Sequence, residues 1–255
     1  MSLHDRGFTH APADPQATGT AGVFAPAFQA LIRREIAQLE PDVIIDQAGS
    51  GRYRRHSKAL LFVEDGELRV MTPKNGVMIY NQGEYNTELP NARRELHVLS
   101  ADLLTAPALQ ALVWHDFGQT RWDGYDLSLP LCVGFSMIRF FIAADAKAES
   151  AIGATPDALH QDGEVYTFAH LLERDNAEGA GNIIAPPHCA GQHPRSVSPR
   201  DILADFTLNE YFDSYAIFDP KVSHYVSALR RQRDGQAAAR TVLLVDFTPM
   251  KLIHQ

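Results

Sequence analysis

Four long strand-like segments in the second half of the chain limit most strongly what this sequence can fold into. They are rich in β-branched and aromatic residues, and clusters of Gly, Pro, Asn and Asp separate them. The segments cover residues 131–143, 165–172, 222–229 and 240–247. A run of strands of this kind is typical of a β-sandwich or a jelly roll.

The first half of the chain contains two helical segments and a hairpin. Apolar residues recur at helical spacing over residues 26–39, and a second helix is expected over 101–118, capped by Ser100. Residues 59–71 alternate as two short strands around an Asp-Gly step, which favours a tight turn. Helices that precede a run of strands predict an α+β, mainly β protein whose N-terminal helices buttress one side of the jelly roll.

The organisation along the chain indicates one domain with an arm in front of it. Residues 1–25 are polar, carry turn formers and lack a signal-peptide pattern, so we expect a flexible N-terminal arm. Residues 26–255 are expected to form a single domain, with a helical and hairpin part at 26–129 and the jelly-roll core at 130–255.

Charge and cysteine content exclude several classes of protein. The net charge of -8 would repel a phosphate backbone, so nucleic acid is not an expected partner. Cys132 and Cys189 belong to no CxxC pair, which indicates neither a disulfide framework nor a zinc knuckle and fits a cytoplasmic protein. The most apolar segment, 129–144, is shorter than the roughly 20 residues that span a bilayer and contains Arg139, so no membrane association is expected.

The sharpest local motif is His160-Gln161-Asp162-Gly163, just ahead of a predicted strand. In an extended segment, residues two apart point to the same face, so His160 and Asp162 can reach one metal ion. Two imidazoles and one carboxylate leave open positions on a metal, as non-haem iron(II) requires to bind an oxidant and a cosubstrate. An HxD pair is also common by chance, and a third ligand must come from elsewhere.

Four downstream histidines are possible third ligands. His170 is too close along the same strand to turn back onto the ion, and His188 and His193 lie in a Pro- and Gly-rich loop, where a zinc site with Cys189 is the less favoured alternative to solvated side chains. His224 instead lies in an alternating strand that places it between two valines on an inward face. His224 is therefore the expected third ligand.

Arg240 opens the last predicted strand and shares a face with Val242 and Leu244. An arginine on an apolar face requires an anion, and a guanidinium can bind the far carboxylate of a dicarboxylate that chelates iron. The alternative is an ordinary salt bridge at the end of a strand.

Several motifs between Arg52 and Phe247 are similar to those of the bacterial 2-oxoglutarate-Fe(II) dioxygenase family that includes L-isoleucine 4-hydroxylase. They are Gly51-Arg52-Tyr53-Arg54-Arg55, Tyr80-Asn81-Gln82 with Asn86, Ile138-Arg139, His160-Gln161-Asp162-Gly163, His224-Tyr225-Val226-Ser227 and Arg240.

The resemblance implies a cupin-like double-stranded β-helix that uses Fe(II), 2-oxoglutarate and O2. It implies His160, Asp162 and His224 as iron ligands and Arg240 as the 2-oxoglutarate anchor. By the same resemblance, the expected partner is a small-molecule substrate, a free L-amino acid or a similar carboxylate, that is hydroxylated or sulfoxidised.

Substrate contacts are less defined by the sequence, and two other functions stay open. The candidate substrate-binding residues are Arg52, Arg54, Arg139, Tyr80 and Asn86. The alternatives are a catalytically silent jelly-roll protein that binds a small ligand or a stress signal, and a zinc-dependent hydrolase with the same ligands.

Overall fold

Three of the four strands predicted in the second half form the centre of a seven-stranded antiparallel sheet in the computed structural model, which describes residues 2–17, 19–42, 51–81, 93–153 and 157–250. The fourth, predicted over residues 222–229, lies in a smaller sheet as β13 (Ser223–Val226). The central strands β6 (Leu131–Ile142) and β15 (Ala238–Pro249) pair along their whole length. The order across the sheet is β1 (Phe8–Ala11), β12 (Ser214–Phe218), β8 (Tyr166–Asp175), β15, β6, β2 (Arg52–Phe62) and β3 (Glu67–Val70). Strand pairing therefore joins the two ends of the described chain in one sheet.

Three smaller sheets complete the β structure. One consists of β11 (Ala204–Phe206), β10 (Asn182–Ala185) and β13 (Ser223–Val226), and another of β7 (Ala151–Ile152), β14 (Leu229–Arg231) and β9 (Ala177–Gly179). The third is the pair β4 (Val77–Asn81) and β5 (Arg93–His97).

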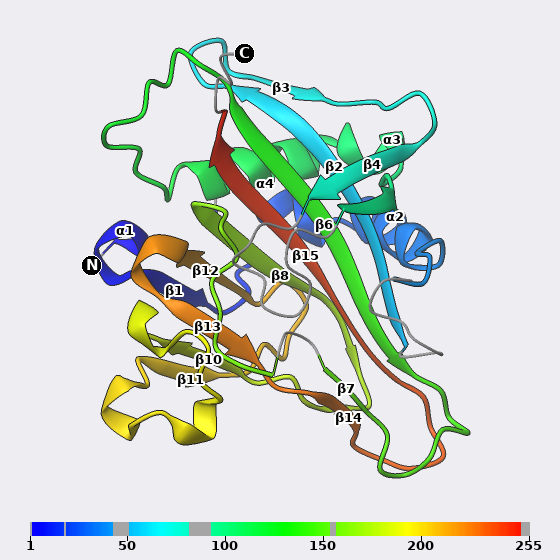
Figure 1. Ribbon diagram of the computed structural model, residues 1–255. Coiled ribbons are helices and arrows are strands. Elements are labelled where there is room, and N and C mark those ends of the chain that lie inside the picture. The colour runs from blue at the N-terminus through cyan, green and yellow to red at the C-terminus, as the bar shows by residue number, and fades with distance from the viewer. Residues whose placement is uncertain (1, 18, 43–50, 82–92, 154–156, 251–255) are drawn as a thin grey trace.

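Helices cover one face of the large sheet, as the sequence predicts (Figure 1). The helices are α1 (Leu3–Arg6), α2 (Pro26–Ile36), α3 (Ala101–Leu104) and α4 (Pro107–Phe117), with 3₁₀ turns at Ala21–Phe24, Pro187–Cys189, Pro194–Ser196, Pro199–Asp201 and Asp219–Lys221. Leucines of α4 pack with Phe135 and Phe247 from the sheet in one core cluster. No helix in the described ranges is long and apolar enough to cross a membrane.

The other face of the large sheet packs against the strands β10 and β13. A second core cluster joins Ile138 and Val242 of the large sheet to Ile184, Val222 and Val226 of the small one. Since side chains alternate along a strand, this second face, called the inner face below, carries a different set of residues from the helix-covered face. The inner face is where the candidate ligands converge.

Most predicted elements are confirmed, with shifted boundaries. The β2–β3 hairpin and the long strands β6, β8 and β15 occur where expected. The second predicted helix is divided into α3 and α4 at Pro107, because a proline occupies the first position of a helix more readily than its interior. These outcomes support the predicted jelly-roll architecture with N-terminal helices.

The prediction of a flexible arm over residues 1–25 is wrong for its described part. Strand β1 pairs with β12 at the edge of the large sheet, and Leu3, Phe8 and Val23 are buried. The Asp213 carboxylate also accepts a hydrogen bond from Ala13 N at 2.9 Å. The arm is held by partners some 200 residues away along the chain, which local sequence patterns do not reveal.

Candidate metal centre

The structure brings His160, Asp162 and His224 together. The donor atoms of the three side chains all lie within 4.8 Å of one another. His160 and His224 form an antiparallel bridge, in which each backbone N–H donates to the other residue's carbonyl at 2.9 Å. This bridge extends the small sheet beyond β13 and places both imidazoles side by side, with ring centroids 4.2 Å apart.

The orientation of the three side chains fits a shared cation. Nε2 of His160 lies 3.5 Å from Asp162 Oδ1, and Nε2 of His224 lies 3.4 Å from Asp162 Oδ2. His160 Nδ1 lies 3.2 Å from the carbonyl of Ala158 and donates to it in the tautomer that leaves Nε2 free as a ligand. Two imidazoles and one carboxylate suit non-haem iron(II) with positions left open for other ligands.

Burial and mutual charge set the protonation of the three groups. Burial lowers the pKa of His224 to about 4, which keeps this imidazole neutral and able to bind a metal. Burial alone would raise the pKa of Asp162, but its interactions with the two imidazoles, including a hydrogen bond from His160, hold the pKa below its usual value. The carboxylate is therefore ionised near neutral pH.

Asp219, which the sequence analysis missed, shapes the loop that carries Asp162. Its two carboxylate oxygens accept hydrogen bonds from the backbone N–H groups of Asp162 and Gly163, at 2.9 and 3.0 Å. Its carbonyl accepts a bond from Gln161 Nε2 at 2.6 Å. Burial and the charge of Asp162 raise the pKa of Asp219 to about 7. No local pattern signals this role, because the two segments lie 57 residues apart.

Arg240 lies on the inner face, as predicted. It is 3% exposed, and within the described ranges its Nε has no hydrogen-bond partner. Burial lowers its pKa to about 10, so the guanidinium stays charged at neutral pH. Tyr215, in the core cluster of the same face, interacts electrostatically with both Arg240 and Asp162. A buried guanidinium with an unused donor fits a carboxylate ligand.

Arg52 and Arg54 lie two residues apart in β2, near a buried ion pair. Arg94 pairs with Asp42, and Arg52 Nε lies 3.2 Å from the same carboxylate. Arg54 instead donates from Nη2 to Ser136 Oγ at 2.8 Å. Burial lowers the pKa of Arg52 to about 10. Arg52 therefore has a protein partner, whereas Arg54 stays a candidate for substrate binding.

Tyr80 connects Arg54 to the loop of the metal ligands. Its ring centroid lies 4.8 Å from Arg54 Cζ and 4.9 Å from the ring of His56. Its hydroxyl donates to Glu164 Oε1 at 3.3 Å. Asn86, the other predicted substrate contact in this region, lies outside the described residues.

Glu164 and Asp246 are acidic residues near Asp162 that the sequence analysis also missed. Burial raises the pKa of Glu164 well above its usual value, and the carboxylates of Asp246 and Asp162 raise it further. Burial raises the pKa of Asp246 to about 6. The sequence did contain a signal for both residues. Asp246 lies an even number of positions after Arg240 and so shares its face of the strand, and Glu164 comes two residues after Asp162.

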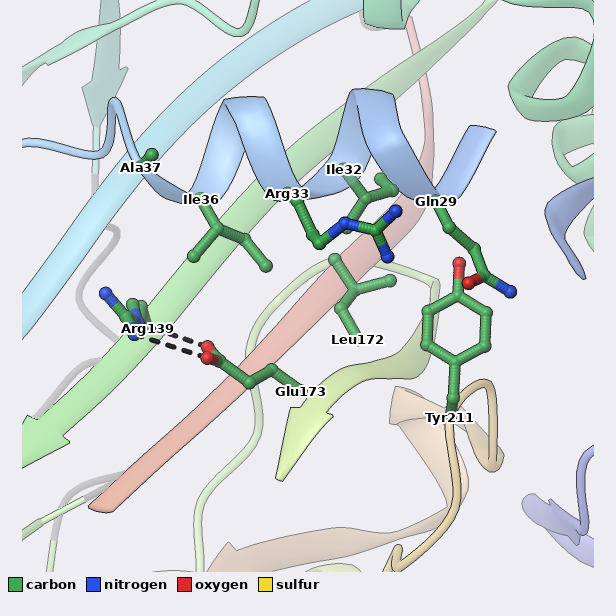
Figure 2. A pocket seen from close by; sticks show the side chains of 9 residues that line it. All are labelled: Gln29, Ile32, Arg33, Ile36, Ala37, Arg139, Leu172, Glu173 and Tyr211. Atoms are coloured by element: carbon green, nitrogen blue, oxygen red, sulfur yellow. Dashed lines mark hydrogen bonds and ion pairs between the residues drawn. The ribbon is translucent and has the colours of Figure 1, made fainter. Parts of the chain in front are cut away.

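Arg139 is corrected as a substrate contact. It forms an ion pair with Glu173 at 3.1 Å on the helix-covered face, in a pocket that Ile36 and Arg33 of α2 also line (Figure 2). Its neighbours Ile138 and Phe140 point to the inner face instead. The one-residue alternation of β6 thus places Arg139 on the face away from His224.

The other histidines do not join the metal ligands. His170 contacts Asp116 of α4 at 2.9 Å and Ser214 at 2.7 Å, and it is a buried core histidine. His188 and Cys189 approach Asp201 as a second group of possible donors, in which His188 is largely exposed. His193 lies 3.7 Å from Asp157, so the alternative zinc site with His188, Cys189 and His193 does not form.

Comparison with known proteins agrees with this arrangement. The model of the 2OG-Fe dioxygenase family matches residues 33–246, most of the chain. A search of curated proteins finds no significant match.

Solved structures share the fold at low sequence identity. IDO from Bacillus thuringiensis is 20% identical with a TM-score of 0.70, over 98% of this chain and 96% of its own. A bsmA homologue from Methylobium petroleophilum is 18% identical with a TM-score of 0.73, over 99% and 92%. The Fe(II)/α-ketoglutarate-dependent dioxygenase TqaL is 13% identical with a TM-score of 0.69, over 97% and 84%.

The family match decides between the functions left open by the sequence. It favours an oxygenase over a silent binding protein or a zinc hydrolase. The ligand set that the structure assembles is the one that such an oxygenase requires. The chain therefore belongs to the 2OG-Fe dioxygenase family and is an enzyme that uses Fe(II), 2-oxoglutarate and O2.

Proposed function

We propose that this enzyme oxidises a free L-amino acid or a similar small carboxylate, at carbon or at sulfur. The convergence of His160, Asp162 and His224, together with the buried Arg240 on the inner face, carries the proposal. The likeness of fold to IDO and the sequence motifs around Arg54 and His160 support an amino acid as the first substrate to test.

His160, Asp162 and His224 would hold the iron, and Arg240 would bind the distal carboxylate of 2-oxoglutarate. When bound, iron(II) and 2-oxoglutarate supply the activation of O2, with release of succinate and carbon dioxide. Other contacts hold the three ligands in position: Asp219 fixes the loop of Asp162, and the His160–His224 bridge fixes both imidazoles.

The direct test is a screen of the twenty proteinogenic L-amino acids for succinate formation from 2-oxoglutarate, with Fe(II) and O2 present. We expect one or a few amino acids to stimulate succinate formation above the level without substrate. Oxidised product should appear in equal amount by mass spectrometry. Stimulation by none of the twenty would contradict the substrate proposal.

The alternative function, a zinc hydrolase, does not account for Arg240. A hydrolytic site has no use for a buried guanidinium such as Arg240, whose Nε has no partner in the described ranges. Turnover that requires Fe(II) and 2-oxoglutarate, and that zinc does not support, is the outcome expected here.

A further inference from the structure

A second group of metal-binding side chains lies outside the candidate metal centre, in the loop of residues 186–203 that connects β10 to β11 (Figure 1). His188, Cys189 and Asp201 each offer one donor atom, and the three atoms lie within 4.8 Å of one another. His188 and Cys189 belong to the first 3₁₀ turn of the loop and Asp201 to its last. The loop therefore brings donors from its two ends together.

These three side chains are available to an ion. His188 Nε2 lies 4.0 Å from Asp201 Oδ1, beyond hydrogen-bond distance, and neither side chain has another oppositely charged group within 4.0 Å in the described ranges. Cys189 is buried and is a free cysteine. Zinc binds sulfur at about 2.3 Å and nitrogen or oxygen at about 2.0 to 2.2 Å, so two donors on one ion lie roughly 3.3 to 3.8 Å apart. From at most 4.8 Å, the donors need to approach one another by no more than about 1.5 Å to share an ion.

The donor types select the metal. A thiolate is a soft ligand that selects zinc or copper(I) over harder cations. Imidazole and carboxylate both occur among zinc ligands, whereas copper(I) prefers softer groups than a carboxylate. Three protein donors and one water make the tetrahedral coordination sphere of zinc. This donor set therefore fits zinc, unlike the two imidazoles and one carboxylate of the candidate metal centre.

The loop contacts the segment that leads into the candidate metal centre. The Leu159 N–H donates to the carbonyl of Gln192 at 2.9 Å, and the Gly191 N–H donates to the carbonyl of Leu159 at 2.7 Å. Leu159 and Cys189 also share a small core cluster. The loop that carries the second donor group is thus bound to the residue directly before His160.

Little regular structure holds the loop itself. It has three 3₁₀ turns of three residues each, and its core cluster has four buried residues, Cys189 and Val197 from the loop with Leu159 and Ala185. An ion bound at both ends of a loop restricts the open forms of that loop, as a metal clip does. The free energy of metal binding then also stabilises the folded loop. Zinc at this position would hold the conformation in which the loop contacts Leu159.

We propose that His188, Cys189 and Asp201 form a zinc site that braces the loop of residues 186–203 against Leu159. Cys189 binds as the thiolate, and its proton passes to solvent when zinc binds. A water molecule completes the coordination sphere of the zinc. The site is structural and separate from the candidate metal centre.

Cobalt(II) spectroscopy tests the site. Co(II) binds where zinc binds, and a thiolate ligand gives a near-ultraviolet charge-transfer band that nitrogen and oxygen ligands do not give. The full-length protein is first loaded with Fe(II) and 2-oxoglutarate without oxygen, so that the candidate metal centre is occupied, and is then titrated with Co(II). We expect the band to reach its maximum at one Co(II) per chain. Added Zn(II) should remove the band, and this competition gives the zinc affinity.

Substitutions of the three donors assign the site. Cys189→Ser should abolish the band. His188→Asn and Asp201→Asn should each weaken zinc binding by more than about 10-fold, since removing even an outer partner of a metal ligand costs that much. The His188 and Asp201 side chains are partly exposed, so these two substitutions should leave the packing of the loop intact. Matched control variants should keep both the band and the affinity; they are Cys132→Ser, His193→Asn and Asp205→Asn.

Amide hydrogen exchange tests the bracing. The N–H groups of Leu159 and Gly191 form the two hydrogen bonds between the loop and its neighbouring segment, so both report on opening of the loop. With zinc at about 100 times its Kd, their exchange should slow by more than about 10-fold in the wild type, since zinc binds the closed loop and not the open one. In Cys189→Ser, zinc should change neither rate by more than about 2-fold.

Three results would refute the zinc site: absence of the charge-transfer band, a band that persists in Cys189→Ser, or wild-type zinc affinity in both His188→Asn and Asp201→Asn. A zinc-sensitive band without slower exchange at Leu159 and Gly191 would refute the bracing of the loop. None of these outcomes depends on the iron ligands, which Fe(II) binding tests separately.

Discussion

At the scale of single residues, Arg240 shows how its surroundings indicate its role. The strand β15 is central in the sheet, and Arg240 is almost fully buried there without a carboxylate within ion-pair distance among the described residues. Burial without an anion is unfavourable for a guanidinium. The dicarboxylate that the enzyme uses would resolve this cost.

Replacement of Arg240 by Lys should therefore raise the KM for 2-oxoglutarate by roughly 10- to 100-fold, because lysine cannot form the bidentate contact. Steady-state succinate formation at varied 2-oxoglutarate measures this. Arg230→Lys, at an exposed position of β14, is the control and should leave the KM unchanged. An unaltered KM in Arg240→Lys would refute the anchor assignment.

Asp42 contributes to the stability of the fold through its ion pairs with Arg94 and Arg52. Burial acts to raise its pKa, but the hydrogen bond from Arg94 and the charges of Arg52 and Arg94 outweigh burial and lower it. Because the pKa of Asp42 is lower in the folded protein, its ion pairs stabilise the fold. This stabilisation is complete above the pKa of Asp in the unfolded chain, about 3.9, and is lost as the pH falls through the pKa of Asp42 in the folded protein.

Asp42→Asn should lower the free energy of unfolding by about 3 to 5 kcal/mol at neutral pH, because it leaves buried guanidinium groups without a carboxylate. Urea unfolding at pH 7 and at lower pH values measures this. The loss of stability on acidification below about pH 4 should be smaller in the variant than in the wild type. Asp65→Asn, in the exposed hairpin turn, should change neither quantity, and equal acid sensitivity of Asp42→Asn and wild type would contradict the account.

At the scale of elements, long strands could be predicted from the sequence and short ones could not. Strands β6, β8 and β15 have enough residues for β-branched enrichment and alternation to stand out. Strands such as β1, β10 and β11 have three or four residues, and pairing with distant segments determines them. Tertiary contacts rather than local preference form these elements.

Strand β1 gives the clearest test of this point. Phe8 is 3% exposed and packs in the inner-face core, so Phe8→Ala should cost about 3 to 5 kcal/mol in urea unfolding. Thr9→Ala, next to it on the strand, should cost no more than about 0.5 kcal/mol. Equal stability of Phe8→Ala and wild type would mean that residues 1–25 are a loose arm after all.

At the scale of the whole molecule, the candidate metal centre is assembled between two sheets. His224 and His160 come from the small sheet, and Arg240 comes from the large one. The three candidate metal ligands could be predicted because each lies in a short extended motif, in which alternation shows which residues share a face. Asp219 could not be, since its contact with the Asp162 loop depends on how the two segments pack. Arg139 was a candidate substrate contact but pairs with Glu173 on the other face, because an alternating strand does not indicate which of two apolar faces holds the site.

Anaerobic Fe(II) binding, measured by equilibrium dialysis, tests the central claim most directly. The wild type should bind one Fe(II) per chain, and His160→Ala, Asp162→Ala and His224→Ala should each weaken binding by more than about 100-fold, beyond the effect of removing an outer partner. His188→Ala, in the second group of possible donors, should still bind one Fe(II). Wild-type affinity in any of the three ligand variants, or loss of iron in His188→Ala, would contradict the account.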